Sequence, residues 1–162
     1  MSQYYGKYRG TVASNVDPLQ LGRLQIEVPS VLGSSRLSWA MPCVPYAGPG
    51  VGFFALPPVG ARIWVEFEHG DPDFPIWVGG FWDQSSDLPA NPPLAQTKVV
   101  KTDVATLTLD DTPGAGGVTI ETTAGMKIVL NAQGIEISTG QGATVKLQGP
   151  KTSVNGAALE VT

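Results

Sequence analysis

Aromatic side chains are absent from half of this 162-residue chain. Tryptophan, tyrosine and phenylalanine make up 8% of the residues, and all of them lie between Tyr4 and Trp82. The stretch from Asp83 to Thr162 therefore lacks the large rings that dominate ordinary protein cores. This absence excludes two equal globular domains, because the second half could not fill a conventional core.

Cysteine, histidine and long apolar runs are also scarce. The one cysteine, Cys43, cannot form a disulfide within a single chain, so the fold does not depend on an oxidising compartment. We expect Cys43 to be a small buried side chain beside Met41 and Val44. No apolar run approaches the length of a membrane span, and the N-terminal sequence MSQYYGKYRG lacks the apolar stretch of a signal peptide. These absences predict synthesis and folding in a cytoplasm.

Basic charge is too sparse for a polyanion partner. Lysine and arginine number 10 against 14 aspartates and glutamates, which gives a net charge of -4. Neither half of the chain is basic. Neutralising the phosphates of DNA or RNA requires clustered Lys and Arg side chains. We therefore expect no nucleic-acid partner.

Glycine and proline are abundant, at 20 and 14 residues, whereas charged residues make up only 15%. This composition favours many short strands and turns. Most prolines precede Leu94, and the stretch SSDLPANPP (Ser85 to Pro93) is typical of a stiff linker. We therefore divide the chain into a first domain at 1–84, a Pro-rich linker at 85–97 and a second domain at 98–162.

The first domain alternates apolar and polar side chains in short segments with no helical period. These segments occupy residues 4–13, 21–28, 39–44, 61–67 and 76–82. Short strands in this number suit a closed barrel of the OB type, because closure removes the exposed edges of a flat sheet. The predicted fold class is therefore all-β, beginning with a five-stranded OB-fold barrel.

The second domain has a repeating sequence pattern. Glycines separate the segments VTIET, MKIVL, IEIST and ATVKL, and within each segment apolar and polar residues alternate. Such a period predicts stacked strands. One parity is aliphatic, and its members are Leu107, Leu109, Val118, Ile120, Met126, Ile128, Leu130, Ile135, Ile137, Val145 and Leu147.

A sheet with one aliphatic face and no covering layer would leave a long apolar stripe in water. Small aliphatic side chains fit close to a threefold axis, where aromatic rings do not. We therefore predict a homotrimer in which three copies pack this face into an intertwined triple-stranded β-helix, or β-prism, and share the hydrogen bonds of their strands. The lysines of this domain are expected to face solvent, and they are Lys98, Lys101, Lys127, Lys146 and Lys151.

An ordered set of motifs runs through the first domain. GRLQIEVPS (Gly22 to Ser30) is followed by Trp39-Ala40, by LPPVG (residues 56–60), by FEHGDP (residues 67–72) and by a Pro-x-x-x-Gly at 75–79. This order resembles the OB domain of phage baseplate assembly protein V. It is also similar to the valine-glycine-repeat spike proteins of type VI secretion and of extracellular contractile injection systems. The second domain resembles the triple-stranded β-helix of those spikes.

The resemblance implies a structural protein that is not an enzyme: the homotrimeric central spike of a contractile injection system, as in a phage tail, a bacteriocin or an extracellular injection particle. In the family, the barrel seats the trimer on a baseplate hub protein, and the β-helix punctures the target membrane transiently. A PAAR-type protein often caps the tip. We expect this chain to be assembled in a bacterial cytoplasm and to reside in the baseplate of such a particle.

The same resemblance suggests contact roles for individual residues. Phe53 and Phe54, in a Gly-rich loop, are candidates for facing the hub. Asn155, Leu159 and Val161 are candidates for contacting the tip protein. They lie in SVNGAALEV, which resembles the blunt tip of the family and is expected to form it over residues 153–162.

Two features of some family members are missing. Some members carry a lysozyme domain between barrel and needle, but here only a short segment separates Trp82 from Thr97. Some spikes end in an iron-binding His-x-His motif, whereas the one histidine here is His69. We therefore expect neither wall hydrolysis nor a metal at the tip.

One strand end is rich in titratable side chains, which are Glu66, Glu68, His69, Asp71 and Asp73. Such a group suggests a metal site or a general-acid pair. However, EHGDPD is also a turn sequence whose Gly, Asp and Pro serve the backbone. The loop AGPGVGF lacks the Lys-Ser/Thr of a phosphate loop. We therefore predict no catalytic residue, no metal, no cofactor and no small-molecule substrate.

Two other functions stay open at this point. OB barrels commonly bind single-stranded nucleic acid or oligosaccharide, and exposed aromatic side chains could stack on the bases. A cell-wall hydrolase could use Glu66 and Glu68. The aromatic candidates for base stacking are Phe53, Phe54, Trp64, Trp77 and Trp82.

Overall fold

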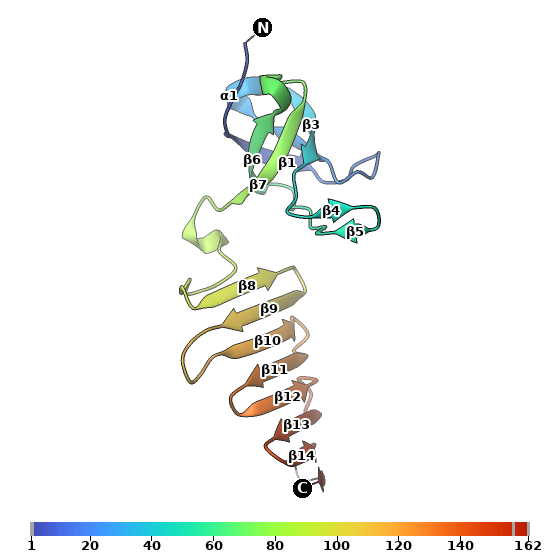
Figure 1. Ribbon diagram of the computed structural model, residues 1–162, viewed down its shortest axis with the longest axis vertical. Coiled ribbons are helices and arrows are strands. Elements are labelled where there is room, and N and C mark those ends of the chain that lie inside the picture. The colour runs from blue at the N-terminus through green and yellow to red at the C-terminus, as the bar shows by residue number, and fades with distance from the viewer. Residues whose placement is uncertain (1, 157, 162) are drawn as a thin grey trace. The chain divides into compact units, whose positions relative to one another are not determined.

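The protein is built almost entirely from strands (Figure 1). A computed structural model describes residues 2–156 and 158–161. The chain divides into two compact units, Met1–Ser85 and Ser86–Thr162. The helical segments among the described residues are single turns: α1 (Pro29–Leu32), η1 (Glu68–Gly70) and η2 (Ser85–Asp87). The predicted all-β class is confirmed, and a turn as short as α1 has no period that a sequence pattern could show.

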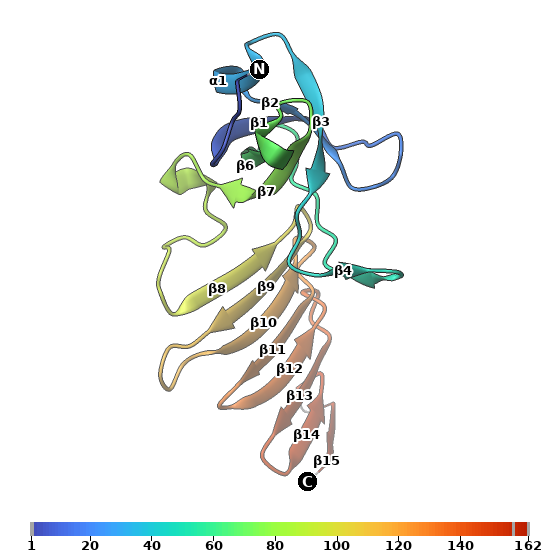
Figure 2. The same cartoon turned by 45° about the horizontal axis from the view of Figure 1, so that its top comes forward.

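The first unit contains a closed barrel of five strands (Figures 1 and 2). Its order is β1-β2-β3-β7-β6, and all pairs are antiparallel except β3 with β7. The predicted OB-type barrel is confirmed. Its strands are β1 (Tyr8–Ser14), β2 (Leu24–Glu27), β3 (Leu37–Pro42), β6 (Arg62–Phe67) and β7 (Pro75–Phe81).

The first strand begins later than expected, at Tyr8 instead of Tyr4. The backbone N–H of Tyr4 donates to the carbonyl of Gly70, and the Tyr4 ring packs edge-on against Tyr8. Both rings also contact Phe67. The N-terminal residues therefore cover one end of the barrel without joining its ladder.

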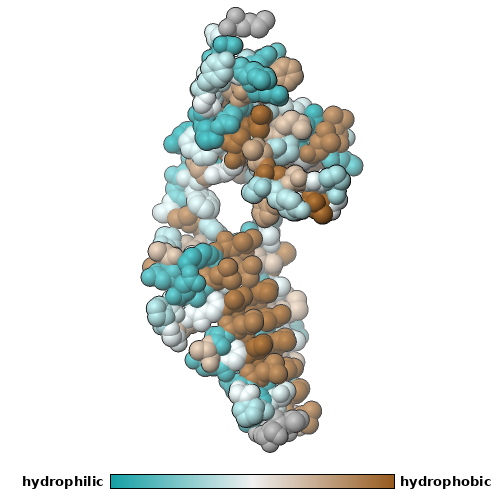
Figure 3. Space-filling model, viewed as in Figure 1, coloured by the Kyte–Doolittle hydropathy of each residue, from teal (hydrophilic) through white to brown (hydrophobic). Residues whose placement is uncertain are grey.

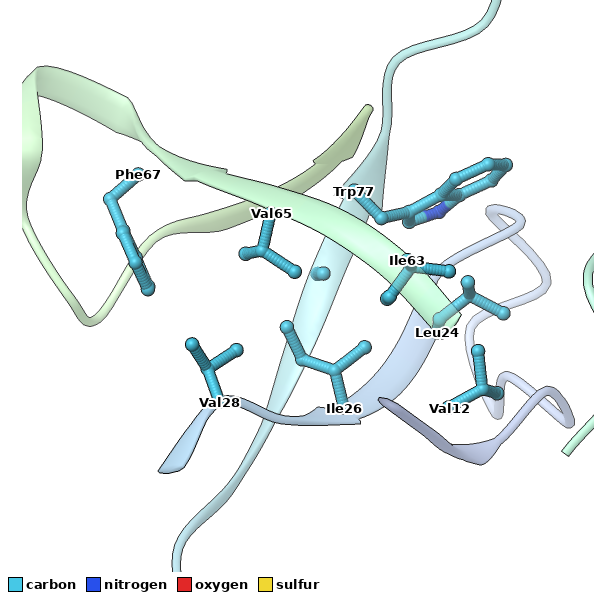
Figure 4. Packing of buried hydrophobic residues seen from close by; sticks show 9 residues of the cluster. Val12, Leu24, Ile26, Val28, Ile63, Val65, Phe67 and Trp77 are labelled. Carbon is cyan, nitrogen blue, oxygen red and sulfur yellow. The ribbon is translucent and has the colours of Figure 1, made fainter. Parts of the chain in front are cut away.

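The barrel core follows from the alternation in its strands. On β6, Ile63, Val65 and Phe67 point inward, and on β2 Leu24 and Ile26 do the same (Figure 4). These side chains are buried because closure turns one parity of every strand toward the barrel axis. The complete cluster is Val12, Leu24, Ile26, Val28, Ala40, Ile63, Val65, Phe67 and Trp77.

The expectation that Cys43 is buried is wrong, because its side chain is exposed. Cys43 lies just after β3, and its backbone N–H donates to the carbonyl of Trp77. Past the end of a strand the alternation no longer determines which side chains face the core. The Gly-rich loop that follows folds into a small hairpin, β4 (Ala47–Gly48) with β5 (Val51–Gly52).

The second unit is an antiparallel ladder of eight strands, which lie one after another like rungs (Figures 1 and 2). Each strand pairs with its neighbours in the same chain. The expected sharing of strand hydrogen bonds among three chains is therefore wrong for this ladder. The strands are β8 (Thr97–Lys101), β9 (Ala105–Asp110), β10 (Gly117–Thr122), β11 (Lys127–Asn131), β12 (Gly134–Ser138), β13 (Thr144–Gln148), β14 (Lys151–Val154) and β15 (Leu159–Val161).

The register of this ladder places the aliphatic positions predicted from the sequence on one face. Ile120 lies opposite Leu107 on one side and Ile128 on the other. Ile128 in turn lies opposite Ile137, which lies opposite Val145. Directly opposed residues in antiparallel strands point to the same face of the sheet. The face that these residues form is called the aliphatic face below.

Candidate functional site

The aliphatic face is the largest feature of the second unit that the fold leaves uncovered. The space-filling view shows apolar side chains gathered in a continuous band over these strands (Figure 3). Of the positions predicted from the sequence, those that are exposed in the single chain range from 36% at Ile128 to 51% at Met126. An exposed apolar band of this extent is typical of an interaction surface.

All the aliphatic residues singled out in the sequence share this face. The register adds three to the predicted trimer core: Val100 opposite Leu107, Val154 opposite Val145, and Leu159, which was predicted as a tip contact, opposite Val154. Their signal was the same alternation, continued into the neighbouring strands, but β8 has two adjacent valines and β14 is otherwise polar. The face therefore extends over more strands than the repeat itself indicated.

The placement of one lysine differs from the expectation. Lys98 lies opposite Leu109, so it belongs to the aliphatic face, where it forms an ion pair with Asp111. The outward placement predicted for Lys98 is therefore wrong. The alternation misassigned Lys98 because β8 contains Val99 and Val100 in succession. With one valine on each face of the strand, the sequence does not show which face is the apolar one.

The opposite face of the ladder is polar. Lys127 pairs with Glu121 at 3.5 Å and Lys146 with Glu136 at 3.1 Å, both across neighbouring strands. Such exposed pairs contribute little stability, about 0.2–1 kcal/mol each. Their consequence is that this face is solvated, which leaves the aliphatic face as the one that requires a partner.

The tip candidates lie in and after the turn that follows β14. The Oδ1 atom of Asn155 accepts a hydrogen bond from the backbone N–H of Thr144, and the backbone N–H of Asn155 donates to the Thr144 carbonyl. Asn155 has a positive φ of 48°, which Asn tolerates better than most residues. Leu159 is exposed. The side chain of Val161 lies outside the part of the chain that is described.

On the first unit, apolar side chains gather around the β4–β5 hairpin. Phe53 and Phe54 are 58% and 79% exposed. They line a pocket of about 390 Å³ together with Leu21, from the loop before β2, and Trp77, from β7. The backbone N–H of Phe53 donates to the carbonyl of Tyr46, which holds the base of the hairpin closed. The two hub-facing candidates therefore lie on one apolar surface.

A neighbouring loop is organised by Asp17, which the sequence analysis missed. Its nearly buried carboxylate accepts hydrogen bonds from the backbone N–H groups of Leu19, Leu21 and Arg23 and from the Arg23 guanidinium. The guanidinium and these N–H donors hold the pKa of Asp17 well below its usual range. The available signal was the turn-forming pair Asp17-Pro18, followed by Gly22-Arg23.

This arrangement predicts a pH-dependent contribution to barrel stability. Because the folded pKa of Asp17 is depressed, its contribution is present above the ordinary carboxyl pKa of about 4 and is lost as the pH falls toward the folded pKa. Replacing Asp17 with Asn should lower the melting temperature of the barrel at pH 7. The difference from the parent should shrink as the pH falls toward 2. Tryptophan fluorescence measures this transition selectively, since every tryptophan precedes Asp83.

The control for this prediction is Asp103→Asn, which changes an exposed carboxylate in the second unit. It should leave the fluorescence melting curve unchanged at every pH. A difference between Asp17→Asn and the parent that stayed constant from pH 7 to pH 2 would contradict the assigned role.

The titratable cluster near η1 serves the local backbone and surface ion pairs. Glu66 pairs with Lys7, Asp73 pairs with Arg36, and Asp71 accepts from the backbone N–H of Asp73. His69 is highly exposed and adopts a positive φ of 52° in the turn. Within residues 2–156 and 158–161, no three His, Cys, Asp or Glu side chains gather as a metal site would require.

The aromatic candidates for base stacking do not all share one surface, since Phe53, Phe54 and Trp77 line the pocket beside the hairpin but Trp64 does not. Trp77 belongs to the barrel core. Trp64 packs against Phe81 at 4.7 Å between ring centroids, and the guanidinium of Arg9 lies over both rings.

None of the described helices is long and apolar enough to cross a membrane.

The chain combines a closed barrel with a ladder whose aliphatic face is uncovered. This combination is typical of an all-β assembly component that buries its apolar face against further copies of itself. Comparison with known families gives the same result. Residues 8–82 match the type VI secretion system and phage-baseplate injector OB domain, and residues 97–160 match the phage baseplate V C-terminal trimerisation domain. The chain belongs to the phage baseplate V family of injector proteins, and its second unit is the trimerisation domain of that family.

A curated relative supports this assignment for part of the chain. The protein is 34% identical over 83 residues to the actin cross-linking toxin VgrG1 of Vibrio cholerae serotype O1. The match covers 49% of this chain but only 8% of that protein. The chain thus spans less than a tenth of the length of this relative.

Proposed function

We propose that this protein is the homotrimeric central spike of the baseplate in a contractile injection system, and that it acts mechanically and without enzymatic chemistry. The observation that carries the proposal is the aliphatic face, which lies on the unit that matches a trimerisation domain. Three copies that bury this face against one another form a shaft with the polar face outward.

The energetics favour such an assembly. Fully burying an aliphatic side chain stabilises a protein by about 1.5–3 kcal/mol, and the members of the aliphatic face are only partly buried in one chain. Burial of the remainder along the ladder therefore stabilises the trimer substantially. Because each ladder is already hydrogen-bonded within its own chain, the apolar contacts act on preformed sheets, and the shaft resists local opening under load.

The proposal includes partners at both ends of the chain. The barrel surface with Phe53 and Phe54 is proposed to bind a baseplate hub protein, since exposed aromatic side chains beside an apolar pocket are typical of protein interfaces. Residues 153–162, with the exposed Leu159, are proposed to contact a PAAR-type tip protein. During contraction the shaft would enter the target membrane transiently.

The oligomeric state tests this function. Light scattering on the purified full chain should give three times the 17.0 kDa chain mass. A chain truncated before Lys98 should stay folded but monomeric, because every residue of the barrel core precedes the linker. A full-length protein that is monomeric at micromolar concentration would contradict the proposed spike.

A further inference from the structure

The aliphatic face is nearly periodic along the ladder. From β10 to β13 each strand contributes two aliphatic side chains to it, and opposed strands place these pairs at matching positions. A trimer in which one chain is shifted by two strands would therefore meet almost the same apolar surface. Apolar packing alone specifies the axial register of three such chains only weakly, as in other repetitive sheets. The pairs are Val118 and Ile120, Ile128 and Leu130, Ile135 and Ile137, and Val145 and Leu147.

One charged group interrupts this periodicity. Among the described residues of strands β8–β15, Lys98 is the charged side chain that the register places on the aliphatic face. Its ammonium group pairs with Asp111, just beyond β9, and also donates to the carbonyl of Gln96 at 3.3 Å. The two side chains keep 52% and 66% of their surface exposed. The pair thus stands at one end of the face, before the repeat begins.

We propose that the Lys98–Asp111 pair sets the axial register of the three chains. The partner is a second copy of this chain, and the inference rests on the trimer of the proposed function. In the aligned trimer the three pairs lie at one level, that of β8, at the end of the aliphatic face. A shift by two strands would place Lys98 against Val118 and Ile120 of a neighbouring chain.

The physical reason is the cost of an ion in apolar surroundings. A shift moves Lys98 and Asp111 together, so the pair stays intact, but both groups lose water against apolar side chains. Desolvating an ion pair in apolar surroundings costs more than the attraction returns unless further hydrogen bonds compensate. A polar residue at one position of an otherwise apolar seam is a known way to fix register. The ion pair therefore disfavours the shifted trimers that the aliphatic side chains by themselves would tolerate.

The test removes the pair and measures distances between chains. A nitroxide label on Thr108→Cys, in a Cys43→Ala background, lies on the polar face and is read by double electron–electron resonance. The parent should show one distance, because a threefold trimer has three equal separations. Lys98→Met with Asp111→Leu should add a second, longer population, since a shift of two strands moves a label by about 10 Å along the axis.

The matched control is Lys146→Met with Glu136→Leu, which removes an ion pair from the polar face. It should retain the single distance of the parent. A single distance in the Lys98→Met, Asp111→Leu trimer would overturn the inference and leave the proposed spike intact. If light scattering shows that the parent protein is a monomer, that result would contradict both the register inference and the proposed trimeric spike.

A second variant covers the case in which the double substitution fails to assemble. Exchanging the charges, with Lys98→Asp and Asp111→Lys, preserves a pair of opposite charges at the same place on the face. This variant should assemble with the single distance of the parent. Multiple distances in the exchanged protein would overturn the inference.

Discussion

Replacing Ile128 with Asp should dissociate the trimer. Ile128 lies near the middle of the aliphatic face, opposite Ile120 and Ile137, and keeps 36% of its surface exposed in the single chain. Assembly would bring three carboxylates together in apolar surroundings. Taking each unpaired charge out of water costs several kcal/mol, at least about 3 kcal/mol per chain. This exceeds the contribution of the isoleucine that it replaces.

Light scattering and thermal unfolding measure this effect. The mass should fall from three chains to one, and the unfolding transition of the ladder should move to a much lower temperature. Tryptophan fluorescence should still report a folded barrel, since all aromatic residues precede Asp83. Lowering the pH should partly restore the trimer, because the protonated carboxyl is neutral and burial raises the pKa of such a group.

The matched control is Val129→Asp, on the same strand but on the polar face, where Val129 lies opposite Thr119 and Glu136. Its cost should be about 1 kcal/mol or less, from a nearby like charge and weaker strand propensity. Trimers should persist. Equal losses from Ile128→Asp and Val129→Asp would show that the aliphatic face is not the interface.

Replacing Gly134 with Ala should disrupt the ladder itself. Gly134 opens β12 with a φ of +138°, and a methyl group built on it would lie 2.0 Å from the carbonyl oxygen of Leu147. No real contact of this kind is that short, so β12 and β13 must separate locally. We expect a loss of about 3 kcal/mol per chain, because both a strained backbone and a broken ladder contribute.

Circular dichroism during chemical unfolding measures this loss, and Gly142→Ala is the control. Gly142 also has a positive φ, of +102°, but nothing lies within 4 Å of the position that a methyl group would occupy. Gly142→Ala should therefore show only the conformational cost, about 1–2 kcal/mol. If the two variants unfolded alike, the close approach to Leu147 would have no energetic consequence.

The limits of prediction from this sequence are local and have physical causes. The alternation located the barrel and the ladder because each strand has one face turned to apolar surroundings. It failed at Cys43, which lies beyond a strand end, and at Lys98, where two adjacent valines made the parity ambiguous. It also missed the loop held by Asp17. The backbone N–H groups that donate to this carboxylate come together only because the chain turns, and a strand alternation carries no information about a turn.

The sequence by itself determined the class of the protein, the two kinds of unit and the need for a partner. These follow from composition and period, since a ring-free half with one aliphatic parity cannot bury its own apolar surface. Only the tertiary structure decided which chain supplies the hydrogen bonds and which charged pair interrupts the aliphatic face. Both depend on strand register, and register is fixed by turns and by pairs of residues distant along the chain.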